Sequence, residues 1–265
     1  MNFKDKVVWI TGATSGIGEA LAFEFASKGA RLVLSARRQE QLEAVATLAR
    51  DRGAPEVMVQ TLDLADAATL QPAADAVLAR MGRVDALFNN GGISQRDKAL
   101  NTPLEVDRRV MEIDFFGTVA LTKAVLPSML EHGGGHIAVT SSLVGKFGSP
   151  YRSAYAAAKH ALHGFYDSLR AELHDQGLKV TIFCPGFIRT QISVNAVTGS
   201  GEKLGTMDDA QANGMSPEQC AAIMARSMEQ GRNEVYIGGR EKLGIYVKRF
   251  FPNIFARIIR KAKVR

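Results

Sequence analysis

Seven short apolar segments, separated by stretches with helical periodicity, constrain the fold of this chain more than any other feature. Near-continuous apolar composition is typical of strands that are buried on both faces, as in a parallel sheet. When such strands alternate with helices through right-handed crossovers, the result is a doubly wound α/β sandwich. The expected strands are residues 6–10, 31–35, 56–61, 84–88, 136–140, 179–183 and 234–237.

Three helix boundaries are predicted from local signals. Residues 17–28 are expected to form a helix that stops at Gly29, because glycine readily adopts a left-handed C-cap conformation. Thr102-Pro103-Leu104-Glu105 and Ser216-Pro217-Glu218-Gln219 each offer a hydroxyl N-cap, a proline at the first helical position and Glu or Gln at the third. We therefore expect helices to start at both sites.

The length of 265 residues, with 46% hydrophobic and 23% charged residues, fits one globular domain. No stretch approaches the length and apolar character of a transmembrane span. The N-terminus runs directly into the first apolar segment, so we expect no signal peptide and a cytoplasmic location. The chain shows neither an internal repeat nor a low-complexity linker.

The cysteines and histidines do not predict a metal site. Cys184 and Cys220 stand in separate elements without ligand spacing, and we interpret both as reduced, structural thiols. His160 and His163 could share a helix face, but no nearby set of ligands completes a site.

The net charge of +6 is concentrated near the C-terminus. Without the seven tail cations the rest of the chain is nearly neutral, which disfavours a uniformly basic nucleic-acid-binding protein. We expect a catalytic domain over residues 1–240 and a basic, apolar extension over 241–265. This extension either contacts an anionic membrane surface or packs on the protein or a dimer partner. The cations are Lys248, Arg249, Arg257, Arg260, Lys261, Lys263 and Arg265, and the large apolar residues run from Leu243 to Ile259.

A glycine-rich turn, Thr11-Gly12-Ala13-Thr14-Ser15-Gly16-Ile17-Gly18, joins the first expected strand to the first expected helix. Backbone N–H groups at such a helix start can hold a pyrophosphate. The second strand is followed by Arg37 and Arg38, where an NAD-binding protein would carry an acidic residue for the ribose. Because arginine matches phosphate geometry, the pair favours the 2′-phosphate of NADP, although a solvated arginine pair is the alternative.

Tyr155 and Lys159 are four residues apart, a spacing that puts a phenol and an ammonium on one helix face. Free tyrosine, with a pKa near ~10, is a poor acid or base at neutral pH unless a cation stabilises its phenolate. By itself the pair is also consistent with an ordinary surface aromatic and cation.

Together these motifs, over residues 6–237, make the chain resemble the short-chain dehydrogenase/reductase family. The turn and the Tyr155/Lys159 pair have the order and separation of that family, and Asn89-Asn90-Gly91-Gly92 stands where members usually have Asn-Asn-Ala-Gly. The resemblance implies a Rossmann-like, seven-stranded parallel sheet with helices on both faces. It also implies a cofactor site comprising Gly12, Thr14, Ser15, Gly16, Ile17, Gly18, Arg37, Arg38, Asp63, Leu64, Asn90, Gly91, Tyr155, Lys159, Pro185, Gly186, Ile188 and Thr190.

The resemblance further implies carbonyl–alcohol chemistry, and the Arg37/Arg38 pair makes NADP(H) the favoured cofactor. Ser142, rather than its neighbour Ser141, stands at the separation of the family's catalytic serine, with Tyr155 as proton donor and Lys159 supporting it. Thr190 and the backbone around Ile188 are expected to hold the carboxamide group of the cofactor's nicotinamide ring. In the family an asparagine whose main-chain carbonyl holds a relay water stands where this chain has Asp114, which could preserve the relay with altered electrostatics or impair it. We expect an active reductase because Ser142, Tyr155 and Lys159 are all present, and Asp114 favours the alternative, a catalytically silent NADP-binding sensor or interaction protein.

Residues 190–216, with four glycines and few apolar runs, suggest a lid over the substrate. Candidate pocket residues are Tyr151, Val144, Phe147, Phe187 and Met207, which do not distinguish steroid, lipid and small-ketone substrates. The family resemblance also implies a homodimer or homotetramer formed through the long helices that begin near Pro103 and Ser153.

Overall fold

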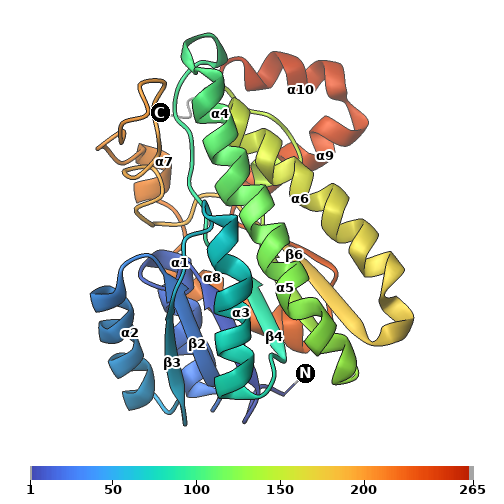
Figure 1. Cartoon of the computed structure of the whole chain (residues 1–265). Helices are drawn as coiled ribbons and strands as arrows, with labels where there is room; N and C mark the ends of the chain where they lie inside the picture. Colours follow the sequence, from blue (N-terminus) through green and yellow to red (C-terminus); the bar gives the residue numbers. More distant parts are fainter. Residues whose placement is uncertain (1, 263–265) are drawn as a thin grey trace.

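The computed structural model describes residues 2–262 and contains one seven-stranded parallel sheet (Figure 1). Lys263 and Arg265 of the basic tail lie outside the described residues. The strand order is β3-β2-β1-β4-β5-β6-β7, which confirms the predicted doubly wound, Rossmann-like sheet. The strands are β1 Val7–Thr11, β2 Arg31–Ala36, β3 Val57–Thr61, β4 Ala86–Asn89, β5 Gly135–Thr140, β6 Leu178–Pro185 and β7 Glu234–Ile237.

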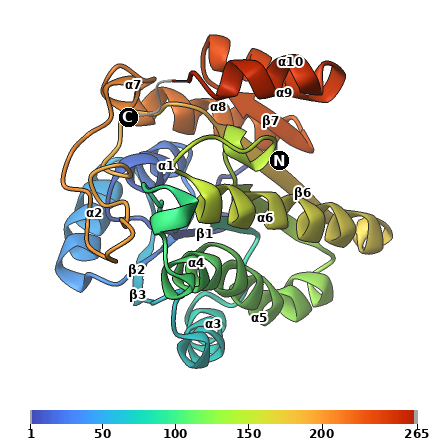
Figure 2. The same ribbon diagram turned by 90° about the horizontal axis from the view of Figure 1, so that it is seen from above.

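Helices cover both faces of the sheet (Figure 2). One layer contains α1 Gly16–Ser27, α2 Gln39–Asp51 and α8 Pro217–Glu229, and the other contains α3 Ala67–Met81, α5 Gly117–Glu131 and α6 Ser153–Glu172. The remaining helices are α4 Leu104–Met111, α7 Asp209–Ala212, α9 Leu243–Phe250 and α10 Pro252–Ile259, with short helical turns at Ala99–Asn101, Leu143–Gly145, His174–Gln176 and Arg240–Lys242.

Strand β1 shows how the apolar segments build two cores. Val7 and Trp9 pack with the layer of α3, α5 and α6, whereas Val8 and Ile10 pack with the layer of α1, α2 and α8. Side chains alternate across a strand, so a strand that is covered on both faces must be apolar at every position. The chain order reverses between β1 and β4, which are neighbours in the sheet. Ligand sites of such sheets lie at this reversal, beyond the carboxyl ends of the strands.

All three predicted helix boundaries are confirmed to within one residue. Ser216 accepts a hydrogen bond from the backbone N–H of Gln219 (3.2 Å), and the Gln219 side chain accepts one from the N–H of Ser216 (3.3 Å), which completes a capping box. Helix α1 ends at Ser27, and Gly29 follows with φ of 72°. The predicted N-cap at Thr102 is wrong. Its hydroxyl donates to the Lys98 carbonyl and accepts from Gln95, so α4 starts at Leu104 without a side-chain cap.

Helices α4 and α5 form one continuous helix, Leu104–Glu131, with a π-helical turn at Glu112–Phe116 between them. We expected no stretch that approaches a transmembrane span. Within residues 2–262 this helix alone is long and apolar enough, but half of its most apolar window is buried inside the fold. Core helices of globular domains satisfy the same criteria, and α5 packs against α3. Single π turns often occur where a helix contributes to a functional site.

The C-terminal helices α9 and α10 form a hairpin that covers part of the same core. Ile245 of α9 and Phe255 of α10 are buried in the cluster that also contains Phe147. The Phe147 and Phe255 rings are 5.1 Å apart. Part of the extension therefore packs on the protein, as one of the two sequence interpretations predicted.

Candidate active site

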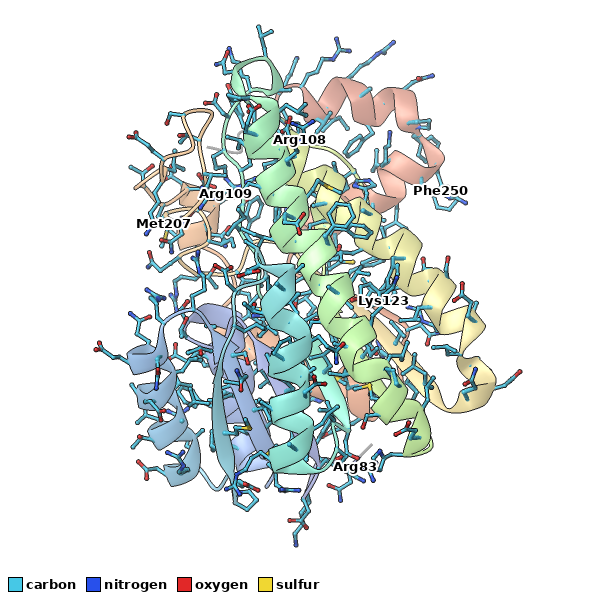
Figure 3. All side chains as sticks on the ribbon, viewed as in Figure 1. Arg83, Arg108, Arg109, Lys123, Met207 and Phe250 are labelled. Atoms are coloured by element: carbon cyan, nitrogen blue, oxygen red, sulfur yellow. The ribbon has the colours of Figure 1, made fainter. Side chains whose placement is uncertain are left out.

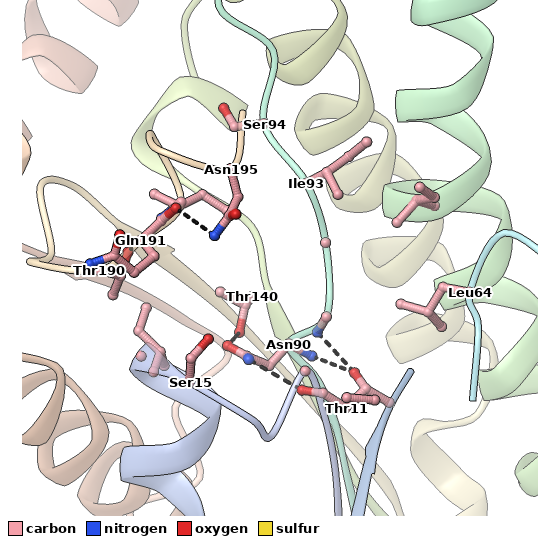
Figure 4. Close-up of a pocket in the computed structure, with 18 of the residues that line it drawn as sticks. Thr11, Ser15, Leu64, Asn90, Ile93, Ser94, Thr140, Thr190, Gln191 and Asn195 are labelled. Atoms are coloured by element: carbon pink, nitrogen blue, oxygen red, sulfur yellow. Dashed lines mark hydrogen bonds between the residues drawn. The ribbon is translucent and has the colours of Figure 1, made fainter. Parts of the chain in front are cut away.

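A cavity of about 430 Å³ opens at the carboxyl ends of the strands. Its walls come from the turn after β1, the ends of β2, β4 and β5, helix α6 and the segment after β6. Figure 4 shows Thr11, Asn90, Thr140 and Thr190 around it. All residues that we predicted for cofactor binding, except Gly18, line this cavity.

Thr11 fixes the contact between the glycine turn and the end of β4 (Figure 4). Its hydroxyl accepts from the N–H groups of Asn90 (3.0 Å) and Gly91 (2.9 Å), and its carbonyl accepts from the Asn90 amide (3.2 Å). A Cβ on Gly12 would lie 2.8 Å from the Gly91 Cα, and Gly12 has φ of 66°. Glycine is therefore required at position 12 by both space and backbone conformation.

Helix α1 starts at the cavity wall, where Ser15, Gly16 and Ile17 line the cavity. Ser15, its N-cap residue, makes no side-chain capping bond, and Gly16 follows with φ of 60°. A Cβ on Gly18 would overlap the Gly12 carbonyl, so Gly18 permits close packing of the turn rather than lining the cavity. Orphan N–H groups and the helix dipole make such a helix start a suitable anion site.

Arg37 and Arg38 lie at the cavity rim after β2, and both are exposed. The Arg38 Nη2 donates to the Thr14 hydroxyl at 3.4 Å, which ties the arginine to the glycine turn. Asp63 and Leu64, which follow β3, line the same end, and Asp63 accepts a hydrogen bond from the Ala65 N–H (3.0 Å). This end of the cavity combines two cations with a helix start, an arrangement suited to phosphate groups.

The two serines that follow β5 have different environments. Ser141 is buried, donates to the Lys159 carbonyl (3.1 Å) and is 3.1 Å from His163 Nε2. Ser142 is half-buried, and its hydroxyl donates to the Pro185 carbonyl at 3.3 Å. Both line the cavity, but Ser141 is engaged with helix α6. Ser142 is therefore the hydroxyl better placed to meet a ligand.

Tyr155 and Lys159 both line the cavity from α6, as their spacing predicted. The Lys159 Nζ is 5.5 Å from the centre of the Tyr155 ring and donates to the Thr140 carbonyl at 3.0 Å. Thr140 ends β5, so the lysine links the helix to the strand that precedes Ser142.

Asp114 lies in the π turn and forms an ion pair with Lys159, with 3.2 Å between Oδ2 and Nζ. Its other oxygen accepts from the Ile93 N–H at 2.8 Å. Burial raises the pKa of Asp114, against the opposing effects of Lys159 and the Ile93 N–H. Burial also lowers the pKa of Lys159, but the Asp114 and Tyr155 charges outweigh it and leave that pKa above its ordinary value. Lys159 is therefore held as a cation.

The segment after β6 closes the cavity opposite α1. Gly186 donates to the Ile237 carbonyl at 2.7 Å, and Gln211 of α7 donates to the Ile188 carbonyl. A Cβ on Gly16 would lie 2.9 Å from the Thr190 methyl group, so the two walls approach closely here. Pro185, Gly186, Ile188 and Thr190 thus lie together, as the sequence predicted.

The apolar residues that we proposed for the substrate pocket do not line this cavity. Val144 and Phe147 are buried in the core, and the cavity is also lined by side chains that we did not predict. These include Ile93, Ser94, Arg109, Gln191, Asn195 and Lys203. In Figure 3, Arg109 lies between α4 and the segment that carries Met207.

The segment 190–216 is anchored by a buried ion pair. The Arg96 Nε lies 3.0 Å from Asp208 Oδ2, and Arg152 approaches the same oxygen at 3.4 Å. Arg96 and Asp208 are 112 positions apart in the sequence, so no local pattern could reveal their contact. Burial and the Arg96 charge lower the pKa of Arg152 to about 10, against the opposing effect of the Asp208 charge.

Within residues 2–262 no group of three His, Cys, Asp or Glu side chains could hold a metal ion.

Fold and cavity together define a nucleotide-binding α/β protein with a tyrosine, a lysine and a serine in its cavity wall. The family model for short chain dehydrogenases matches residues 6–200. The chain is 43% identical to "Dehydrogenase/reductase SDR family member 7B" of Danio rerio, over 97% of this chain and 85% of the relative. It is 42% identical to "Dehydrogenase/reductase SDR family protein 7-like" of Drosophila melanogaster, over 98% and 81%.

Solved structures agree with this relationship. A short-chain dehydrogenase from Streptomyces avermitilis superposes with a TM-score of 0.82 at 30% identity, over 96% of each chain. A short-chain dehydrogenase/reductase from Burkholderia phymatum in complex with NAD has a TM-score of 0.85 at 23% identity, over 100% of this chain and 98% of the other, and supports the fold. The chain belongs to the short-chain dehydrogenase/reductase family of oxidoreductases, which bind a nicotinamide cofactor.

Proposed function

We propose that this protein is an NADP(H)-dependent oxidoreductase that interconverts a carbonyl and a secondary alcohol of a small molecule. The observation that carries the proposal is that Ser142, Tyr155 and Lys159 line one cavity with the glycine turn. A phenol, a buried cation and a half-buried hydroxyl at the end of a cofactor-sized cavity form a proton-transfer site beside a redox site.

In the reduction, the Tyr155 hydroxyl gives its proton to the carbonyl oxygen. The Ser142 hydroxyl donates a hydrogen bond to the same oxygen and so orients the substrate. Lys159, held as a cation beside the ring, stabilises the phenolate that Tyr155 becomes. In the oxidation, the same phenolate accepts the alcohol proton.

The cavity walls fit a dinucleotide because they offer glycines and the start of helix α1, with two cations at the rim. The start of α1 would hold the pyrophosphate, and Arg37 and Arg38 would hold the 2′-phosphate. Lys159 would bind the nicotinamide ribose, and Thr190 with the backbone of Ile188 would hold the carboxamide. When bound, NADPH supplies the hydride that the carbonyl carbon accepts.

Asp114 supports a second candidate function. Its ion pair with Lys159 engages the cation that would otherwise act on Tyr155 and the ribose. A protein with this pair could bind NADPH without catalysing hydride transfer, as a sensor or interaction protein. We favour the reductase because Lys159 remains beside the Tyr155 ring in spite of the pair.

The test is NADPH oxidation with a panel of ketones and aldehydes, and NADP⁺ reduction with the corresponding alcohols. NADH is the comparison cofactor. Tyr155→Phe should abolish turnover with NADPH binding retained. Tyr246→Phe, which removes a hydroxyl from exposed helix α9, is the matched control and should retain full activity. Turnover that survives in Tyr155→Phe would refute the role of Tyr155, and tight NADPH binding without turnover on the whole panel would favour the silent sensor.

Assembly into a homodimer or homotetramer is also part of the proposal. The helix that begins at Leu104 and helix α6 lie side by side on one layer and would form the interface. Exposed Leu104 and Phe116 on the first of these helices support this choice of surface. Sedimentation velocity of the full chain tests it, and a monomer at all concentrations would argue against it.

A further inference from the structure

The α9–α10 hairpin has an apolar face that the described protein leaves uncovered. Its inward side chains, Ile245 and Phe255, are buried, whereas its outward side chains remain between 51% and 69% exposed. Figure 3 shows Phe250 pointing away from the body of the protein. Exposed apolar residues are normal when scattered singly, but a contiguous group marks a binding surface. The group is Leu243, Tyr246, Phe250, Phe251, Ile254 and Ile258.

The same hairpin carries a concentrated positive charge. Lys248, Arg249, Arg257, Arg260 and Lys261 are all exposed, and residues 243–262 contain no aspartate or glutamate. The ion pairs found within residues 2–262 involve none of these five cations. This surface, which we call the hairpin face, therefore combines exposed large apolar side chains with uncompensated cations.

The hairpin face is held in a fixed position by its inner side. A Cβ on Gly244 would lie 3.3 Å from the Phe147 ring, so α9 sits directly on that ring, and the Phe255 ring packs on it from α10. Phe147 belongs to the loop that carries Ser142. In Figure 1 the hairpin, the start of α4 and the segment with α7 all lie at the same end of the molecule, beyond the carboxyl ends of the strands. The hairpin face and the cavity thus share one end of the protein.

From this arrangement we propose that the hairpin face docks on a membrane surface with anionic headgroups. Apolar side chains of an amphipathic helix bury in the boundary between headgroups and acyl chains, and basic side chains beside them are attracted to anionic lipids. Docking would hold the protein at the surface with the end that contains the cavity turned toward the lipid. The proposal does not depend on which reaction the cavity catalyses.

A second copy of the chain is a less suitable occupant. In a two-fold symmetric dimer the same patch faces itself, so five cations would meet five cations. Like charges across an interface are strongly unfavourable. An anionic lipid surface can bind both the cations and the apolar side chains of the hairpin face. A symmetric second copy could bind only the apolar side chains.

Vesicle sedimentation of the full chain tests the proposal. We expect binding to vesicles of phosphatidylcholine with about one-third phosphatidylserine at low salt, and weaker binding by at least about tenfold to phosphatidylcholine alone. Raising the salt toward 1 M should also weaken binding, since the Debye length falls from about 10 Å to about 3 Å. No sedimentation with anionic vesicles at low salt would overturn the proposal.

Two variants separate the apolar and the charged contributions. Phe250→Ser/Ile254→Ser should lower vesicle binding at least about tenfold, because two large apolar side chains no longer enter the lipid. Leu48→Ser on α2, which alters an apolar side chain that is 46% exposed elsewhere, should bind as wild type. If the double variant instead dissociates an oligomer and wild type ignores vesicles, the face belongs to a second copy and the proposal fails.

The charge variant Lys248→Gln/Arg249→Gln/Arg257→Gln should lower binding to anionic vesicles by about a hundredfold, because each cation near the surface contributes about fivefold. Lys123→Gln/Lys179→Gln/Arg226→Gln removes the same number of exposed cations elsewhere and should change little. Thermal unfolding of each variant verifies that it folds. Equal losses in both triple variants would mean that net charge, not the hairpin face, governs binding, and would overturn the proposal.

Discussion

Lys159 and Asp114 form a buried ion pair, with 3.2 Å between Nζ and Oδ2, in the wall of the candidate active site. From the sequence we expected position 114 to act through its backbone carbonyl, with the aspartate charge altering the electrostatics of the relay. The structure instead puts the Asp114 side chain on the lysine and on the Ile93 N–H. The carboxylate therefore offsets part of the positive field that Lys159 exerts on the Tyr155 ring.

Asp114→Asn should shift the pH–rate profile of alcohol oxidation toward lower pH. Oxidation requires the phenolate, and removing the carboxylate leaves the lysine cation free to favour it. The change is nearly isosteric and introduces the residue that many family members carry, so the fold should tolerate it. The measurement is the initial rate of NADP⁺ reduction between pH 6 and pH 10.

Glu112→Gln is the control for this change, because Glu112 lies in the same π turn and does not line the cavity. Its profile should match that of wild type. An unshifted or upward-shifted profile in Asp114→Asn would mean that the Asp114 carboxylate does not weaken the effect of Lys159 on Tyr155.

Arg37→Ala/Arg38→Ala should raise the KM for NADPH by about ten- to a hundredfold and leave the KM for NADH nearly unchanged. Charge-assisted hydrogen bonds to a phosphate are worth about 1.5–3 kcal/mol, and only NADPH carries the 2′-phosphate. Arg80→Ala, at an exposed arginine paired with Glu56, controls for loss of a surface cation. A parallel rise for both cofactors would show that the arginines act on a part that NADH and NADPH share.

Ser141 and Ser142 provide a matched pair of serine-to-alanine changes. Ser142→Ala should lower kcat by about 10²–10³ with little change in unfolding, as is typical of a lost donor to a reacting oxygen. Ser141→Ala should mainly destabilise the protein, by about 1–3 kcal/mol, because it leaves the buried His163 Nε2 without its hydroxyl partner and removes a hydrogen bond to the Lys159 carbonyl. Denaturant unfolding and single-turnover kinetics distinguish the two effects. If Ser141→Ala were the catalytically damaging change, the assignment of the two hydroxyls would be reversed.

The sequence was informative wherever a local pattern determines the structure. Burial on both faces makes β1 continuously apolar, and the capping box at Ser216 satisfies two backbone N–H groups within four residues, so both could be predicted. The Tyr155/Lys159 pair was predictable for the same reason, since helix geometry alone brings the two side chains together.

Contacts outside the local patterns, most of them between distant segments, explain what the sequence did not reveal. Thr102 has the pattern of an N-cap, but its hydroxyl is engaged by Lys98 and Gln95, so the local prediction failed. Phe147 looked like a pocket residue because it follows Ser142, yet it packs against Phe255, which is more than a hundred positions away. The Lys159–Asp114 and Arg96–Asp208 pairs likewise join distant segments, and only the folded structure brings them together.

His136 on β5 predicts how stability depends on pH. Burial and the Lys179 charge lower its pKa to about 4, and its Nε2 lies 2.8 Å from the Thr181 hydroxyl, which itself donates to the Arg232 carbonyl. The imidazole therefore donates to Thr181 and is neutral in the fold. Between pH 6.5 and pH 4 the unfolded chain binds a proton that the folded protein does not, so stability falls as the pH decreases through this range.

Each pH unit in that range costs about 1.4 kcal/mol, so His136 should account for about 2 kcal/mol of the stability lost between pH 7 and pH 5. His136→Gln keeps a donor for Thr181 but does not titrate. Between pH 7 and pH 5 its free energy of unfolding should therefore fall by about 2 kcal/mol less than that of wild type. His174→Gln, in an exposed turn, should keep the wild-type dependence. Urea unfolding at pH 7, 6 and 5 measures all three proteins, and identical slopes for wild type and His136→Gln would show that His136 is not the group that titrates on unfolding.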